Sequence, residues 1–230
     1  MRLDRLLCQH PKWSRRHVLG LLVQGRVQVN QQVVHSPTLE VTAFDTVLAD
    51  GELIQPGKAA HYLMLNKPAG ILSATDDPVH PTVMDLLPPE LAKELHIGGR
   101  LDRASTGLML LTNDGQWSRR ATDPERKSPK IYRVTLGNPI HPDTEKVFAE
   151  GIHFPFEDIT TSPAKLERLS DTECRLTIYE GRYHQIKRMF GRFRNPVIAL
   201  HREAMGAIRL DSNLQPGQFR SLTDEEIASV

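Results

Sequence analysis

The chain has 230 residues, enough for one large domain or for a small and a medium domain. Charged residues make up 25% and hydrophobic residues 39%, and this balance excludes a wholly disordered chain. No apolar stretch approaches the roughly 20 residues that a membrane-spanning helix needs, so we expect no membrane partner. Two cysteines are too few for a disulfide framework, and no signal-peptide pattern opens the sequence, which together predict a cytoplasmic protein.

The net charge of +1 hides two basic segments. Residues 1–30 carry six Lys or Arg residues and one acid, whereas residues 31–57 carry four acids and no Lys or Arg. Residues 175–209 carry eight Lys or Arg residues and two acids. A solvated surface is the simpler interpretation of a charged run. Two basic segments that also predict regular structure favour a partner with a phosphate backbone.

The N-terminal segment predicts two short helices. Leucines at positions 3, 6 and 7 lie on one face of a helix over residues 2–9. Ser14 is a good N-cap for a second helix over residues 15–24, and Gly25 stands where a glycine ends such a helix.

A hairpin follows, with alternating residues over 26–29, a turn at Asn30-Gln31 and a return through residues 32–34. The arrangement resembles the S4 RNA-binding domain, through the motifs Arg2-Leu3-Asp4, Ser14-Arg15 and Gly25-Arg26-Val27-Gln28-Val29-Asn30. Gln31 stands where that domain usually has glycine, which leaves the turn geometry open. The resemblance implies RNA contacts by Arg15, Arg16 and Arg26. The alternative is a generic small helical domain.

Turn and linker residues at Asp50-Gly51 and over residues 55–58 predict a domain boundary. We therefore divide the chain into residues 1–57 and residues 58–230. The second part predicts a mixed α+β domain, because alternating strand patterns occur between short helical segments.

Three of its elements bear on function. A strand is expected at residues 62–65, ending in a turn over 66–70, and a second apolar strand at residues 108–112. A helix is expected over residues 183–193, with an apolar stripe beside a line of basic side chains.

Chemistry that depends on a bound metal or nucleotide has no support in the sequence. Ten histidines are present, but no His-x-His, His-Glu-x-x-His or Cys-x-x-Cys spacing occurs. No dinucleotide-binding glycine fingerprint appears, and Ala59 follows Gly57-Lys58 where a phosphate-binding loop needs Ser or Thr. We therefore expect neither a metal nor a cofactor.

The loop before the strand at 108–112 exposes an acid between glycines. Arg100 and Arg103 flank Asp102, and opposite charges a few Å away favour an ionised carboxylate. An ionised, positioned aspartate suits nucleophilic or anionic chemistry at a sugar carbon. Taken alone, the pattern is more typical of a turn with surface ion pairs.

Five motifs in chain order resemble the RsuA/RluA-type pseudouridine synthases. They are Asn66-Lys67-Pro68-Ala69-Gly70, Gly99-Arg100-Leu101-Asp102 with residues 106–115, Lys130-Ile131-Tyr132, residues 181–189, and Leu200-His201-Arg202-Glu203. Residues 76–83, residues 222–230 and Lys187 resemble the branch that modifies small-subunit (16S) ribosomal RNA. The resemblance covers nearly the whole chain. It implies an S4 domain followed by an antiparallel-rich α+β catalytic domain.

The implied reaction isomerises one specified uridine of 16S rRNA to pseudouridine without a cofactor. Asp102 would be the nucleophile, or the anion that starts proton loss at C2′. Tyr132 would stack on the flipped base and Lys187 would pair with Asp102. Arg100 would hold the site open or grip the RNA backbone, and Ile186 would pack beneath the aspartate. Without the motifs, Tyr132 would be a core aromatic and Lys187 a surface lysine.

Further basic side chains are candidate phosphate contacts, namely Arg182, His184, Arg188 and Arg202. The expected partner is ribosomal RNA or a 30S assembly intermediate, and the expected state is a monomer. Two alternatives remain open. One is the same chemistry on 23S rRNA or tRNA, and the other is a non-catalytic rRNA-binding assembly factor.

Overall fold

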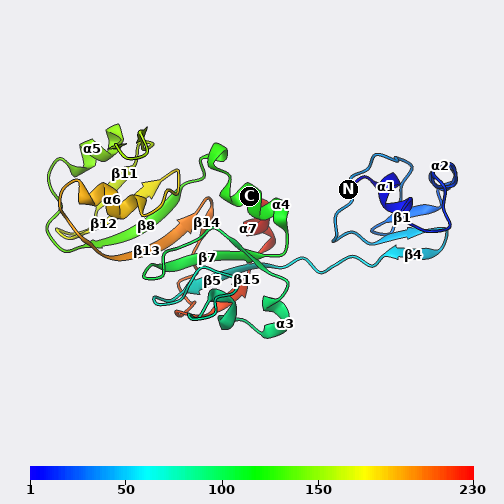
Figure 1. The fold of residues 1–230 in the computed structure, drawn as a ribbon, viewed down its shortest axis with the longest axis horizontal. Coiled ribbons are helices and arrows are strands. Elements are labelled where there is room, and N and C mark those ends of the chain that lie inside the picture. The colour runs from blue at the N-terminus through cyan, green and yellow to red at the C-terminus, as the bar shows by residue number, and fades with distance from the viewer. The chain divides into compact units, whose positions relative to one another are not determined.

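The computed structural model describes residues 1–230, which divide into two compact units, Met1–Ala60 and His61–Val230 (Figure 1). Each unit has a hydrophobic core of its own. None of the helices combines the length and the apolar character that crossing a membrane requires.

The N-terminal unit packs helices α1 (Leu3–Leu7) and α2 (Arg15–Val23) against a small antiparallel sheet. The sheet order is β2 (Gln32–Val33), β1 (Val27–Val29), β3 (Val47–Ala49) and β4 (Glu52–Gln55). The Ser14 hydroxyl accepts a hydrogen bond from the His17 backbone N–H at 3.2 Å, which confirms the predicted N-cap. Gly25 takes the left-handed conformation that ends the helix.

The β1–β2 turn is left-handed at both central residues, with φ of 51° at Asn30 and 67° at Gln31. This is the turn geometry that suits the twist of a two-residue hairpin. The Asn30 amide supports the turn, because it donates to the Asp45 carboxylate and accepts from the Thr46 N–H. Gln31 therefore adopts the conformation for which a glycine is usual.

A nine-stranded mixed sheet organises the second unit. The order is β11 (Lys165–Arg168), β12 (Glu173–Ile178), β8 (Lys130–Leu136), β13 (Val197–Met205), β7 (Thr106–Thr112), β5 (Tyr62–Lys67) and β15 (Phe219–Ser221), with β14 (Ile208–Arg209) beside β13 and β6 (His96–Gly98) beside β7. Every pair is antiparallel except β7 and β13. The predicted α+β class and antiparallel-rich sheet are confirmed.

Helical segments connect the strands, and one more follows the last strand. They are η1 (Val83–Leu86), α3 (Pro89–Ala92), α4 (Gly115–Thr122), η2 (Pro124–Arg126), α5 (Thr144–Glu150), α6 (Gln185–Gly191) and α7 (Asp224–Ala228), and the hairpin β9 (His153–Phe154) and β10 (Ile159–Thr160) follows α5. Asp114 caps α4, because its side chain accepts hydrogen bonds from two backbone N–H groups of the first turn.

Strand β7 is apolar from Leu108 to Leu111 because both of its faces are buried there. Leu108 and Leu110 pack with Trp117 of α4 in one core cluster, and Met109 and Leu111 pack in the other. The alternation of a strand thus divides one apolar run between two cores. A buried central strand gives the loop before it a rigid anchor.

Two elements near the Asp102 loop have boundaries that differ from the prediction. Strand β5 continues through Asn66 and Lys67, which were expected to begin a turn, because both side chains find buried hydrogen-bond partners. The expected helix over residues 183–193 begins only at Gln185 and ends at Gly191. His184 has a left-handed φ of 49°, so Tyr183 and His184 precede the helix.

Candidate active site

Asp102 lies in the loop of residues 99–105, between β6 and β7. Gly107 lies just after the loop, where the chain enters β7. Only glycine fits there, because φ is 103° and a Cβ would collide with the Arg202 carbonyl oxygen. The Asp102 carbonyl accepts from the Ser105 N–H at 3.0 Å and closes a tight turn. The motif glycine is thus required by the close approach of β13.

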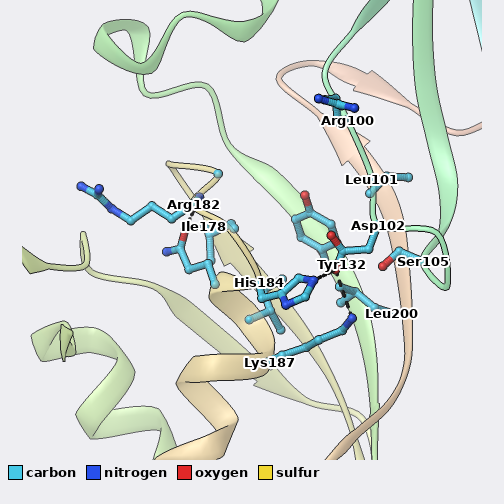
Figure 2. A pocket seen from close by; sticks show the side chains of 13 residues that line it. Arg100, Leu101, Asp102, Ser105, Tyr132, Ile178, Arg182, His184, Lys187 and Leu200 are labelled. Atoms are coloured by element: carbon cyan, nitrogen blue, oxygen red, sulfur yellow. Dashed lines mark hydrogen bonds and ion pairs between the residues drawn. The ribbon is translucent and has the colours of Figure 1, made fainter. Parts of the chain in front are cut away.

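The Asp102 carboxylate faces two cationic or protonatable groups. Its Oδ2 lies 3.1 Å from Lys187 Nζ and 3.5 Å from His184 Nε2 (Figure 2). The flanking arginines do not pair with it, contrary to the simplest expectation. Arg100 Nε donates to the Ser73 carbonyl and Arg103 Nε donates to the Gly70 carbonyl, each at 3.1 Å. The loop turns these side chains away from the acid between them.

The first turn of α6 delivers Lys187. Ile186 and Met189 face the core and leave Lys187 beside the pocket. The buried Gln185 amide fixes the segment before the helix, since it accepts from the Arg182 N–H and donates to the Glu180 carboxylate. This local bonding, together with the left-handed His184, aims the imidazole at Asp102.

A pocket of about 90 Å³ opens above this ion pair. Its walls include Asp102, Tyr132, Ile186 and Leu200. Tyr132 comes from the middle of β8 and is only 6% exposed, with its ring beside Asp102 (Figure 2). An aromatic ring, a carboxylate and its paired lysine therefore share one small cavity, the arrangement expected of a site that accepts a flipped base.

Arg202 is not a phosphate contact, and that prediction is wrong. The side chain is 1% exposed, and its guanidinium donates to the carbonyls of Leu108 at 2.8 Å, Gly99 at 3.2 Å and Arg100 at 3.3 Å. Its position on β13, directly beside β7, buries it against the entry of the Asp102 loop. Arg202 holds that loop instead of touching RNA.

Lys67 belongs to one of the five motifs but received no role from the sequence, and the structure shows that it supports the Asp102 loop. It is fully buried at the end of β5, and its Nζ donates to the carbonyls of Ser105 at 2.8 Å, Pro68 at 3.0 Å and Arg103 at 3.2 Å. Burial lowers the pKa of Lys67 to about 8, although the negative charge of Asp102 opposes the shift. The sequence feature that could have indicated a buried lysine here is its position at the end of an apolar run, directly before Pro68-Ala69-Gly70.

Ser73 also holds the Asp102 loop in place, in addition to Arg202 and Lys67. Its hydroxyl donates to the Leu101 carbonyl at 2.6 Å and accepts from the Leu101 N–H at 3.0 Å. Nothing in the sequence distinguishes Ser73 from a surface serine.

The other two predicted phosphate contacts, Arg182 and Arg188, differ in how far their charges are already paired within the protein. Arg182 donates Nε to Glu180 at 3.1 Å and is partly exposed. Arg188 forms two bonds of 2.7 and 2.5 Å to Glu157 and stacks over Phe154, so its charge is already matched.

In the N-terminal unit the three candidate arginines also differ. Arg15 and Arg16 are exposed at the start of α2. Arg26 forms an ion pair with Asp50. Arg15 and Arg16 are thus the two that form no ion pair, although Arg15 lies in the electrostatic field of Asp4.

No group of three or more His, Cys, Asp or Glu side chains within residues 1–230 is arranged to hold a metal ion. The carboxylate of the pocket is instead matched by Lys187 and His184.

Comparison with known proteins decides the family. The family model described as RNA pseudouridylate synthase matches residues 61–191, which span β5 to the end of α6. The chain belongs to the RNA pseudouridylate synthase family. A second model, the S4 domain, matches residues 1–47. The chain is therefore a pseudouridine synthase with an N-terminal S4 domain, as its motifs predict.

Relatives of this synthase match along its whole length. A protein of Pseudomonas aeruginosa named ribosomal small subunit pseudouridine synthase A is 54% identical over 230 residues, covering 100% of both chains. The protein of the same name from Escherichia coli K12 is 46% identical over 231 residues, again covering 100% of both. A crystal structure of a pseudouridylate synthase superposes with a TM-score of 0.73 at 40% identity, covering 100% of this chain and 99% of that one.

Proposed function

We propose that this synthase isomerises one uridine of small-subunit (16S) rRNA to pseudouridine. The observation that carries the chemistry is the Asp102 carboxylate, paired with Lys187 and set beside Tyr132 in one small pocket. Support for the target comes from the full-length relatives, which are named for the small ribosomal subunit. Residues 1–57 would be the RNA-binding domain and residues 58–230 the catalytic domain.

The proposed reaction begins when the target uridine leaves its stack, at a cost of a few kcal/mol. The base enters the pocket and stacks on Tyr132, with Ile186 packed below. Asp102 then either attacks C1′ of the ribose or removes the proton from C2′, and the N1–C1′ bond breaks. The base rotates and C5 bonds to C1′, as the bond between Asp102 and C1′ breaks in the first route or as Asp102 returns the proton to C2′ in the second. C5 then loses the proton that it carried, and N1 takes one up.

Charge would help at each stage of this reaction. Lys187 and His184 keep the Asp102 carboxylate oriented through their contacts at 3.1 and 3.5 Å. Arg100 uses only its Nε on the Ser73 carbonyl, so its terminal nitrogens remain for the RNA backbone near the flipped nucleotide. Arg182 would add a phosphate contact at the rim, and Arg188 a weaker one because Glu157 matches its charge.

Ribosomal RNA is the class of partner on which this family acts. We further propose that the substrate is rRNA or a 30S assembly intermediate, that the enzyme is a monomer, and that it works in the cytoplasm. Arg15 and Arg16 of α2 would contact the RNA backbone, with Arg26 more weakly because of its pairing with Asp50.

The experiment that tests the target maps pseudouridine in 16S rRNA, 23S rRNA and tRNA from a strain that lacks the gene. We expect one 16S position to lose its pseudouridine, and the wild-type gene to restore it. A position lost from 23S rRNA or tRNA with 16S rRNA unchanged would contradict the proposed target. No lost position in any of the three would contradict the proposed activity.

A further inference from the structure

A second and larger cavity adjoins the catalytic pocket. Its volume is about 520 Å³, within the ~300–1,000 Å³ typical of ligand sites. Both cavities are lined by Arg100, Asp102 and His184, so they share a wall. The larger one continues past this wall to Arg103 and Tyr183. The proposed reaction places the target base in the smaller pocket, beside Tyr132, which does not line the larger one.

Tyr183 gives this cavity an aromatic wall. It is 78% exposed, an unusual state for a large aromatic side chain in a segment as tightly bonded as this one. Its ring stacks on the His184 imidazole, with centroids 3.9 Å apart and an interplanar angle of 21°. The stack holds the ring in place while most of its surface remains open to a further planar group.

The charges around the cavity favour an anion. Arg100 and Arg103 each donate a hydrogen bond from Nε to a backbone carbonyl. A carbonyl carries no net charge, so these bonds do not neutralise the two guanidinium groups. Of the lining acids, Asp102 pairs with Lys187, and the Asp77 carboxylate accepts from the N–H groups of Val79 and His80 while also lying in the electrostatic field of Arg103. Neither guanidinium forms an ion pair, and two such groups beside an open aromatic face fit a nucleotide, which brings a phosphate and a planar base together.

We propose that this cavity binds the nucleotide adjoining the target uridine, with its base stacked on Tyr183 and its phosphate held by Arg103 and Arg100. The inference rests on the proposed function, because it places the neighbour of the uridine that the catalytic pocket accepts. Asp102 and His184 line both cavities, so the cavities are neighbours. Two nucleotides that follow each other in the RNA can therefore occupy them at the same time. The neighbour is then unstacked along with the target, so recognition extends beyond the reacting base.

The test measures the affinity of the full chain for three synthetic rRNA fragments centred on the converted uridine. One fragment is intact, and the other two carry an abasic site on the 5′ or the 3′ side of that uridine. Tyr183→Ala should weaken binding of the intact fragment about 5- to 150-fold, the range for one stacked base. With one of the two abasic fragments, wild type and Tyr183→Ala should bind within about twofold of each other, because the same contact is already absent.

Two further variants sharpen the result. Tyr183→Phe keeps the ring and should recover most of the affinity that Tyr183→Ala loses. Phe156→Ala removes another exposed aromatic, one that does not line the cavity, and its effect should be equal on all three fragments. Equal loss by Tyr183→Ala on all three fragments, or no loss on the intact one, would overturn the proposal.

Turnover of the intact fragment is measured in parallel and separates the two hypotheses. A wild-type enzyme that forms no pseudouridine while the binding pattern holds would contradict the proposed function and leave the nucleotide site in place. Normal turnover without that binding pattern would remove the nucleotide site alone.

Discussion

Four basic side chains surround Asp102, and they act on it in two ways. Lys187 and His184 contact the carboxylate itself. Lys67 and Arg202 are buried and donate only to backbone carbonyls, four of which belong to the loop on either side of the acid. Neither of these buried cations has a carboxylate partner, so each is held by hydrogen bonds to oriented carbonyl dipoles. The loop is thereby fixed without neutralising the acid that it presents.

Burial of Lys67 predicts a measurable pH dependence of stability. The folded chain loses the Lys67 proton near pH 8, whereas the unfolded chain keeps it to about pH 10.5. The unfolded state therefore binds more protons in this window, and the free energy of unfolding rises with pH by up to about 3 kcal/mol from this group. Urea unfolding of wild type and Lys67→Met between about pH 7 and pH 10.5 isolates the effect, because the other titrations are common to both proteins. The stability difference should shift in favour of wild type as the pH rises, and a constant difference would contradict the assigned pKa.

At the scale of elements, the site forms where the loop before β7 meets the first turn of α6. The resemblance to the synthase motifs indicated both pieces, whereas the residue pattern alone favoured a surface turn at Asp102 and a surface lysine at position 187. Neither predicted how the loop is held. Arg202 carries the same charge as the exposed arginines around it, and only the pairing of β13 with β7 buries it.

The start of α6 shows a second limit of sequence-based prediction. The apolar spacing of residues 186, 189, 190 and 193 continues a helical pattern back through Tyr183. The chain instead adopts a left-handed conformation at His184, where Gln185 bonds back to Glu180 and Arg182. The local hydrogen bonds of the Gln185 side chain thus outweigh the helical spacing of the apolar residues at this position. This departure is what leaves Tyr183 exposed and turns His184 toward Asp102.

The role of Arg202 can be distinguished from a phosphate contact by substitution. Arg202→Met leaves the Leu108, Gly99 and Arg100 carbonyls without their donor, and we expect the free energy of unfolding to fall by about 2–4 kcal/mol. The rate of pseudouridine formation should fall with it, because the loop loses its anchor. The salt dependence of RNA binding should stay unchanged. A salt slope reduced by about 0.7 to 0.9 with normal stability would instead identify a phosphate contact.

At the scale of the whole molecule, a net charge of +1 conceals the distribution that suits RNA. Acids over residues 31–57 offset the basic start of the chain, and one of them, Asp50, pairs with Arg26. The structure thus divides the basic residues into those matched within the protein and those left for a partner. Composition could not make that division, because it depends on which side chains the fold brings together.

The exposed arginines of α2 supply the prediction for the first unit. Arg15→Gln with Arg16→Gln should weaken RNA binding and reduce the slope of log affinity against log salt by about 0.7 to 0.9 for each RNA phosphate that the variant no longer neutralises. Arg26→Gln is the matched control, and we expect it to change the slope less because Asp50 already matches its charge. Binding titrations of the full chain between low and moderate salt make the measurement. An unchanged slope in the double variant would contradict RNA binding by α2.

The central claim is that the Asp102 carboxylate performs the isomerisation, and tritium release tests it most directly. Formation of the C5–C1′ bond expels the hydrogen at C5, so rRNA made with 5-tritiated uridine releases tritium on each turnover. Asp102→Asn preserves the size of the side chain and removes its charge, and RNA affinity measured alongside it should remain close to wild type. We predict that Asp102→Asn abolishes tritium release while RNA binding persists. Release within about tenfold of wild type would contradict the assignment of Asp102.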